Sequence, residues 1–165
     1  MILIVGSGGN GQSYFMNFIR KNNIKINNKN DYDRLKHISK PNMNKLKHIT
    51  KCIFLYNEPC KSILSHFRRK WQFIQLEKLG NPFNLKAENV KNLNIFFYLT
   101  KKHKKDIFGI KYQFDNWINS NLHFPIYFLN FNDILYNKKT LDNFIGKKLN
   151  YDFLNLKREE IINII

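Results

Sequence analysis

The residues most suited to chemistry in this sequence are the glycines and serines near its beginning. They occupy positions 6–13, in the order Gly6, Ser7, Gly8, Gly9, Asn10, Gly11, Gln12 and Ser13. Glycine lets a backbone adopt positive φ angles and approach an anion closely. Where such a loop leads into a helix, its N–H groups and the helix dipole together favour negative charge. The composition of this loop therefore predicts a phosphate-binding site.

The segments on either side of the loop support this interpretation. Residues 1–5 form a short apolar run, which is typical of a buried strand, and residues 14–20 have the apolar spacing of an amphipathic helix. The spacing Gly6-x-x-x-x-Gly11-x-Ser13 is that of the P-loop, although Gln12 stands where the usual lysine would be. A tight turn between a strand and a helix, without a ligand, is the alternative.

Further strands and helices must position this loop, and their order predicts a single domain over residues 1–165. Apolar runs predict buried strands at 52–56 and 125–130, with weaker strands at 24–26 and 34–40. Apolar spacing predicts helices over 60–79, 87–104, 107–119 and 140–145, one helical turn within 42–47, and a last helix within 150–165. This alternation is typical of an α/β fold, a three-layer sandwich with a mainly parallel sheet.

Residues that follow different strands are expected to meet in one cleft. Ligands of parallel sheets bind at the carboxyl ends of the strands. The loop 6–13 follows the first strand, Asn57 and Ser65 follow the second, and His37 lies near the end of the weak strand 34–40. In the long helix 60–79, the apolar side is predicted to carry Ile63, Phe67, Trp71 and Ile74.

These pieces, taken together, resemble the P-loop sulfotransferases, which use 3′-phosphoadenosine-5′-phosphosulfate (PAPS). That family opens with a strand, a glycine- and serine-rich loop and a helix, which residues 1–20 match. An apolar strand, an Arg-x-Pro turn and a serine six residues after the proline are matched by residues 52–59 and Ser65. A later strand, a Tyr-Glu-Asp-Leu-like segment and a Phe-Leu-Gly sequence are matched within residues 126–149. The resemblance implies a P-loop NTPase-like, sulfotransferase-like fold.

The resemblance also implies a site with two halves that holds PAPS or its desulfated product, PAP. The loop 6–13 would hold the 5′-phosphosulfate through its N–H groups and the Ser13 hydroxyl, while Asn57 and Ser65 would hold the 3′-phosphate. His37 would be the general base that takes the proton of a hydroxyl acceptor, for example on a carbohydrate. The acceptor itself is not defined by the sequence.

Two charged residues of the family are replaced in this chain. Gly9 stands where the loop has a basic residue, and Asn57 stands in place of the arginine before the proline. Asparagine carries no charge and cannot form the bidentate ionic pair of arginine with phosphate. Arg68 and Arg69, together with Lys36, could return positive charge to the cleft. A catalytically inactive protein that binds PAP or another nucleotide is therefore a second interpretation.

The composition is strongly basic, with a formal net charge of +16 from 28 Lys and Arg against 12 Asp and Glu. Such charge attracts nucleic acid, anionic membrane surfaces or phosphorylated small molecules. The abundance of Asn, Lys and Ile is also what an AT-rich genome produces, so the lysines do not by themselves identify a partner. A nucleic-acid-binding protein is one further alternative. A P-loop small-molecule kinase is another, which Gln12 disfavours because the usual lysine bridges the β and γ phosphates.

The remaining features concern metals and membranes. Cys52 and Cys60 show neither metal-ligand spacing nor a disulfide framework, so no metal is expected. No apolar stretch reaches the length of a transmembrane helix. The first strand begins at Met1, which leaves no residues for a signal peptide. We therefore expect a soluble, cytoplasmic protein whose partners are a small-molecule sulfate donor and a hydroxyl acceptor.

Overall fold

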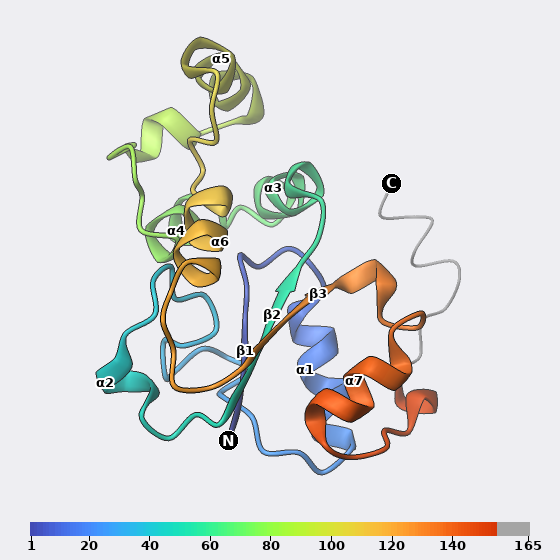
Figure 1. Cartoon of the computed structure of the whole chain (residues 1–165). Coiled ribbons are helices and arrows are strands. Elements are labelled where there is room, and N and C mark those ends of the chain that lie inside the picture. The colour runs from blue at the N-terminus through green and yellow to red at the C-terminus, as the bar shows by residue number, and fades with distance from the viewer. Residues whose placement is uncertain (155–165) are drawn as a thin grey trace.

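The computed structural model describes residues 1–154, and its centre is a sheet of three parallel strands (Figure 1). The strands are β1 (Ile2–Val5), β2 (Lys51–Tyr56) and β3 (Ile126–Asn130), and β2 lies between the other two. Ile53 of β2 lies opposite Ile4 of β1 and Tyr127 of β3. The predicted α/β class, the parallel sheet and the three clear strands are confirmed.

Helices cover both faces of the sheet. The helices of the described residues are α1 (Gln12–Lys21), α2 (Met43–Leu46), α3 (Pro59–Arg68), α4 (Gln72–Lys78), α5 (Leu93–His103), α6 (Ile110–Ile118) and α7 (Lys138–Ile145). Three short 3-10 helices, η1 (Ala87–Val90), η2 (Phe131–Asp133) and η3 (Tyr151–Phe153), lie in the connections. Figure 1 shows α1 and α7 on one side of the sheet, with α2 and α6 on the other, while α3, α4 and α5 lie beyond the carboxyl ends of the strands.

The two faces of the sheet explain the continuous apolar character of the strands. Successive strand residues point to opposite faces. Ile4 of β1 and Ile53 of β2 pack against Phe15 of α1 on one face. Leu3 and Phe54 pack against Trp117 of α6 on the other face. A third cluster joins α4, η1 and α5 around Leu76, Val90 and Phe96. The sheet is thus buried on both sides, and its carboxyl edge is left for the connecting loops.

The helix predicted over residues 60–79 is wrong as a single element, because the chain breaks between α3 and α4. Lys70 has a left-handed backbone with φ of 58°. The N–H of Lys70 donates to Phe67 O at 3.1 Å, and the N–H of Trp71 donates to His66 O at 3.0 Å. This is the Schellman ending that glycine usually provides. The break leaves Trp71 54% and Ile74 59% exposed, so the predicted apolar side does not continue into α4.

The strand predicted at 34–40 is also wrong, since this segment is a series of turns. Asp31 and Arg34 have φ angles of 62° and 55°, and the Asp31 carboxylate accepts a hydrogen bond from the N–H of Lys36. These turns prevent a regular ladder. The segment nevertheless lies beside the end of β1, because the N–H of Gly6 donates to Lys36 O at 3.1 Å.

The other elements differ from the predictions mainly at their ends. The weak strand at 24–26 is reduced to a single bridge between Ile2 and Ile26. The helix predicted over 87–104 is divided into η1 and α5 at Asn92, whose side chain accepts from the N–H of Ile95. α2, α6 and α7 confirm the helical segments expected there, and α7 ends at Gly146 as predicted. Most of the last predicted helix lies outside the described residues.

Candidate functional site

The glycine-rich loop follows β1 and leads into α1, as the sequence predicted. Gly8, Gly9 and Gly11 all have positive φ angles, of 75°, 67° and 79°. They are also close-packed: a Cβ added at Gly9 would lie 2.6 Å from Ser62 O of α3, and one added at Gly11 would overlap the Phe131 ring. Glycine is therefore required here both by conformation and by space.

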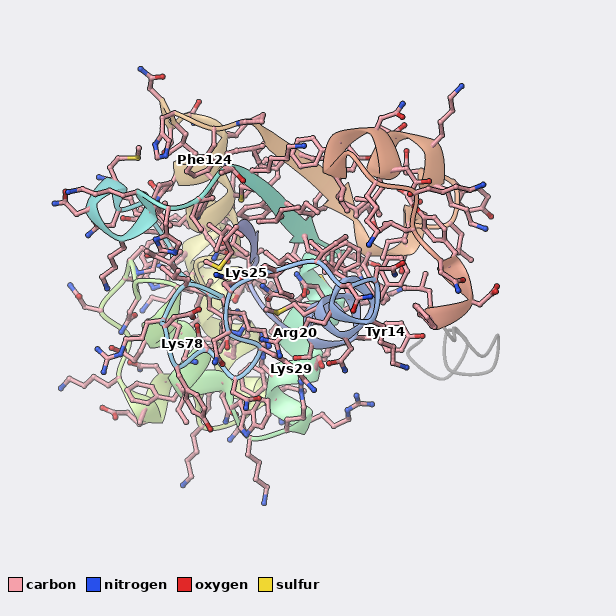
Figure 2. All side chains as sticks on the ribbon, turned by 90° about the horizontal axis from the view of Figure 1, so that it is seen from below. Tyr14, Arg20, Lys25, Lys29, Lys78 and Phe124 are labelled. Carbon is pink, nitrogen blue, oxygen red and sulfur yellow. The ribbon has the colours of Figure 1, made fainter. Side chains whose placement is uncertain are left out.

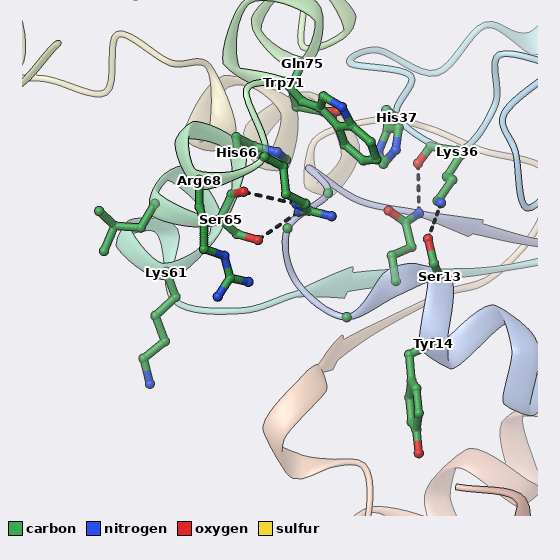
Figure 3. Close-up of a pocket in the computed structure, with 16 residues that line it drawn as sticks. Ser13, Tyr14, Lys36, His37, Lys61, Ser65, His66, Arg68, Trp71 and Gln75 are labelled. Atoms are coloured by element: carbon green, nitrogen blue, oxygen red, sulfur yellow. Dashed lines mark hydrogen bonds between the residues drawn. The ribbon is translucent and has the colours of Figure 1, made fainter. Parts of the chain in front are cut away.

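A cavity of about 350 Å³ lies between this loop and α3 (Figure 3). It brings together most of the residues that the sequence singled out. These are Gly8, Gly9, Gly11, Gln12, Ser13, His37, Ser65, Arg68 and Arg69. Lys36, Lys61, His66, Trp71 and Gln75 also line it, together with Tyr14 and Leu64. Residues distant in the sequence thus converge at the carboxyl edge of the sheet.

Several predicted residues have structural positions instead. Asn57 does not line this cavity; its Oδ1 accepts from the N–H of Glu58 and from the Asn132 side chain. Asn10 is fully buried, and its Nδ2 donates to Leu55 O at 2.7 Å. Gly6 and Ser7 do not line the cavity either. A Cβ on Gly6 would overlap Leu55 O, so this position is set by packing against β2.

Gln12 stands where the P-loop spacing would place a lysine, and its side chain is engaged in a way that rules out the role of such a lysine. Its side chain is almost completely buried, and Nε2 donates to Ile4 O at 3.2 Å and to Lys36 O at 2.9 Å. The amide therefore ties the loop to β1 and to the neighbouring turn. It leaves the site without a cation from its own loop.

Lys36 supplies the positive charge that the loop lacks. Its Nζ donates to Ser13 Oγ at 2.7 Å and to Lys29 O at 2.9 Å (Figure 3). Burial lowers the pKa of the Lys36 amine, and the nearby Asp31 carboxylate opposes this effect. An ammonium group has three N–H donors, so one stays available to a ligand beside Ser13.

Two histidines flank Gly8, of which His66 is buried and His37 is half-buried. His37 Nδ1 lies 2.9 Å from Gly6 O, and because a carbonyl accepts, Nδ1 carries the hydrogen and Nε2 is left with its lone pair. His66 of α3 lies 3.3 Å from Ser7 O through Nε2 and stacks on Phe108. Burial is the main cause that lowers the pKa of each imidazole to about 4. Both rings are therefore neutral near pH 7.

The α3 side of the cavity is cationic. Arg69 Nη2 donates to Ser65 Oγ at 2.8 Å, and the Arg69 guanidinium lies 5.0 Å from the centre of the Trp71 ring. Arg68 and Lys61 line the same side. Among the described residues that line the cavity, none is acidic. The site therefore combines a glycine-rich loop, four basic side chains and two neutral histidines, which is an environment for an anion.

Sequence reasoning missed His66, Trp71 and Gln75. Gln75 Nε2 donates to Ser7 O at 2.8 Å, which fixes α4 against the loop. These contacts depend on the break at Lys70, for which the sequence has no glycine or proline signal. His66 follows the predicted Ser65 directly. The sequence does not define how α3 is oriented on the loop, so it could not show that His66 faces the loop.

Comparisons with protein-family models, with curated proteins and with solved structures found no match to this chain. Within residues 1–154, no group of three His, Cys, Asp or Glu side chains is arranged to hold a metal ion. No helix in the same residues combines the length and the apolar character needed to cross a bilayer. The functional argument accordingly depends on the geometry of the cavity.

Proposed function

We propose that the chain binds a nucleotide of the 3′-phosphoadenosine type, PAPS or PAP, in the cavity between the glycine-rich loop and α3. The observation that carries this proposal is the convergence of loop, Lys36, Arg68 and Arg69 on a space whose described lining has no acidic residue. Two separate groups of donors suit a ligand with two anionic groups. The resemblance to sulfotransferases supports this choice of nucleotide.

The loop side would hold the 5′ end of the ligand. The N–H groups of Gly9, Gly11 and Ser13 have no acceptor among the described residues, and they lie at the start of α1. The ammonium of Lys36 would add charge at the same place through its contact with Ser13. Backbone donors at a helix N-terminus and a lysine together are a common way of holding a phosphate.

The α3 side would hold the second anionic group. Ser65 and Arg69 are already hydrogen-bonded to each other, and Arg68 lies one residue away on the exposed side of the helix. These residues take over the 3′-phosphate role, since Asn57 lies outside the cavity. The half-exposed Trp71 offers an aromatic surface for the base.

The reaction that this arrangement would serve is sulfuryl transfer from PAPS to a hydroxyl group. The acceptor oxygen would bond to sulfur as the bond from sulfur to the bridging phosphate oxygen breaks. His37 Nε2 would take the hydroxyl proton, because Nδ1 is engaged with Gly6 O. Lys36 would stabilise the negative charge left on the departing phosphate.

A binding protein without catalysis is a second candidate, which a specific observation favours. Burial lowers the pKa of His37 to about 4, so its imidazole is a weak base. A kinase is disfavoured because the Gln12 amide is bonded to backbone carbonyls.

Nucleic-acid binding would use the overall charge. Figure 2 shows basic side chains that come from several elements, among them Arg20, Lys25, Lys29 and Lys78. Basic residues that gather on one face are the electrostatic footprint expected of nucleic-acid binding, but no nucleic-acid-binding motif accompanies them in the sequence, so this candidate rests on charge alone.

Calorimetric titration of the full chain with PAP, with ATP as the control ligand, tests the proposal. We expect PAP to bind more tightly than ATP, and we expect Ser13→Ala and Ser65→Ala each to weaken PAP binding. Unchanged PAP affinity in both variants would remove the site. A chain that ignores PAP but binds an oligonucleotide, with affinity that falls steeply as salt rises, would instead support the nucleic-acid interpretation.

A further inference from the structure

A second cavity lies at the carboxyl ends of β2 and β3, between α3, α5 and α6. It is separate from the cavity between the glycine-rich loop and α3, which we call the phosphate site. We propose that the second cavity binds a small amphipathic anion, with an aliphatic or aromatic body and a single carboxylate or similar head group. Its volume is about 850 Å³, which is within the range of small-molecule sites. This inference does not depend on the proposed nucleotide function.

The body of the ligand would be held by apolar side chains from three helices. They are Ile63 of α3, Phe96 and Phe97 of α5, and Ile110 and Phe114 of α6. Phe97 is 50% exposed although it lies beside the buried Phe96. Ile63, Ile110 and Phe114 are half-buried, so together with Phe97 they leave one continuous apolar wall open to a ligand. A concave site lined mainly by such side chains is typical of small-molecule binding, whereas a single exposed apolar residue is ordinary.

The charge around this cavity selects an anion. Its two acidic residues are already engaged, because Glu58 pairs with Lys61 and the Asp106 carboxylate accepts three backbone N–H groups. Lys111 pairs with Asp115, and Lys105 lies over the Phe83 ring. Lys104 lines the cavity and has no ion-pair partner among residues 1–154. Lys105 likewise has no ion-pair partner in these residues, but its ammonium lies over the Phe83 ring, so the Lys104 ammonium is the one best placed for a head group.

Helix α3 separates this cavity from the phosphate site. Lys61, Ser65 and Arg68 face the phosphate site at spacings of three and four residues, whereas Cys60 and Ile63 line the second cavity. At about 100° per residue, Ile63 lies on the opposite side of the helix from these three side chains. The two ligands therefore occupy different spaces, and each can be tested while the other site is left intact.

The test is calorimetric titration of the full chain with decanoate, with decanol and decyltrimethylammonium as probes of the same length and different charge. We expect decanoate to bind more tightly than the other two. Phe97→Glu should weaken decanoate at least about tenfold, because it places a like charge among the apolar contacts. Tyr98→Glu is the matched control, since Tyr98 is a 66% exposed neighbour on α5 that does not line the cavity, and it should leave binding unchanged.

A second variant tests the head group without disturbing the apolar wall. Lys104 caps α5 in a left-handed conformation with φ of 52°, which asparagine tolerates well. Lys104→Asn should weaken decanoate about two- to fivefold and leave decanol unchanged, as expected for one partly exposed ion pair. Lys102→Gln, on the same helix outside the cavity, should change neither. Absence of decanoate binding, equal binding of decyltrimethylammonium, or full binding by Phe97→Glu would overturn the proposal.

Discussion

Replacement of Lys36 by methionine should separate ligand binding from stability. Methionine keeps most of the length and the apolar contacts of this side chain, which is only 7% exposed, and removes its charge. If Lys36 serves the bound anion, PAP affinity should fall while the fold is largely retained. If Lys36 only supports the loop, its replacement should lower PAP affinity and the free energy of unfolding together.

The magnitude follows from the contacts of the ammonium group. A hydrogen bond from a charged donor contributes about 1.5–3 kcal/mol, so PAP should bind about 10- to 150-fold more weakly. The folded protein loses the bonds to Ser13 Oγ and Lys29 O, which on the same scale contribute about 1.5–3 kcal/mol each, but it no longer buries a charge whose pKa is already lowered by that burial, and desolvation of a buried ion costs several kcal/mol. These effects oppose each other, and we expect the free energy of unfolding to change by no more than about 1 kcal/mol.

The assay combines PAP titration by calorimetry with urea unfolding at the same pH and salt. Lys78→Met is the matched control, because Lys78 is a nearby cation that pairs with Asp31 and does not line the cavity. Its PAP affinity should change less than about threefold, as expected for an exposed charge. An unchanged PAP affinity in Lys36→Met would refute the reasoning, as would a loss of several kcal/mol in stability that matches the loss of affinity.

Three further predictions concern the loop and its histidines. Gly9→Ala should lower the free energy of unfolding by about 2–4 kcal/mol, because it combines a positive φ with overlap on Ser62 O. Gly146→Ala should cost only about 1 kcal/mol, because φ is 84° but the added Cβ would lie at an ordinary contact distance of 3.6 Å from Lys51 Nζ; urea unfolding of both variants compares them. The unfolded chain protonates His66 near pH 6.5, but the folded chain does so only near pH 4, so the free energy of unfolding should fall as pH drops through this window. Between pH 7 and pH 5 this histidine accounts for a loss of about 2 kcal/mol. Urea unfolding at the two pH values should show a smaller loss for His66→Gln than for the parent chain. If sulfuryl transfer occurs, His37→Gln should slow it about 100-fold or more, while PAP affinity is retained; an assay of sulfate transfer from PAPS to hydroxyl acceptors measures the rate. In the same assay, the parent chain should keep its rate at pH 5 and lose it only as pH approaches about 4, since the neutral imidazole is the active form.

Local sequence patterns were sufficient for the sheet and for the loop. The three strands are short apolar runs, which are buried along β1 and the centre of β2 and half-buried along β3 except at Leu129. The turn after β1 contains the glycines that its positive φ angles require. These features depend on neighbouring residues, so the sequence displays them directly. The same holds for α7, which ends at Gly146 in the left-handed conformation.

The errors arose where tertiary contacts decided the backbone. Lys70 adopts a left-handed conformation that is usually found at glycine, and no glycine or proline near it in the sequence indicates the end of α3. The turns around Asp31 and Arg34 depend on carboxylate bonds to backbone N–H groups, which leave no apolar pattern. The resemblance to an arginine turn predicts Asn57 in the phosphate-binding half of the site, but its short side chain is bonded to Asn132 and lies outside the cavity between the glycine-rich loop and α3.

The resemblance to sulfotransferases would place a basic residue at position 9 of the loop, and the packing of the loop explains why glycine stands there instead. Position 9 lies so close to α3 that a Cβ would meet Ser62 O at 2.6 Å, so no side chain fits there, whatever its charge. Gln12 cannot replace it because its amide bonds to the backbone. The close packing of α3 on the loop that excludes a side chain at position 9 also brings Ser65 and Arg69 to the cavity, while Lys36 enters beside Ser13 from the neighbouring turns. Gly9→Lys, which introduces the basic residue that the resemblance to sulfotransferases would place here, should therefore displace α3 and weaken PAP binding. Urea unfolding with PAP titration of this variant would show whether charge or packing governs the site.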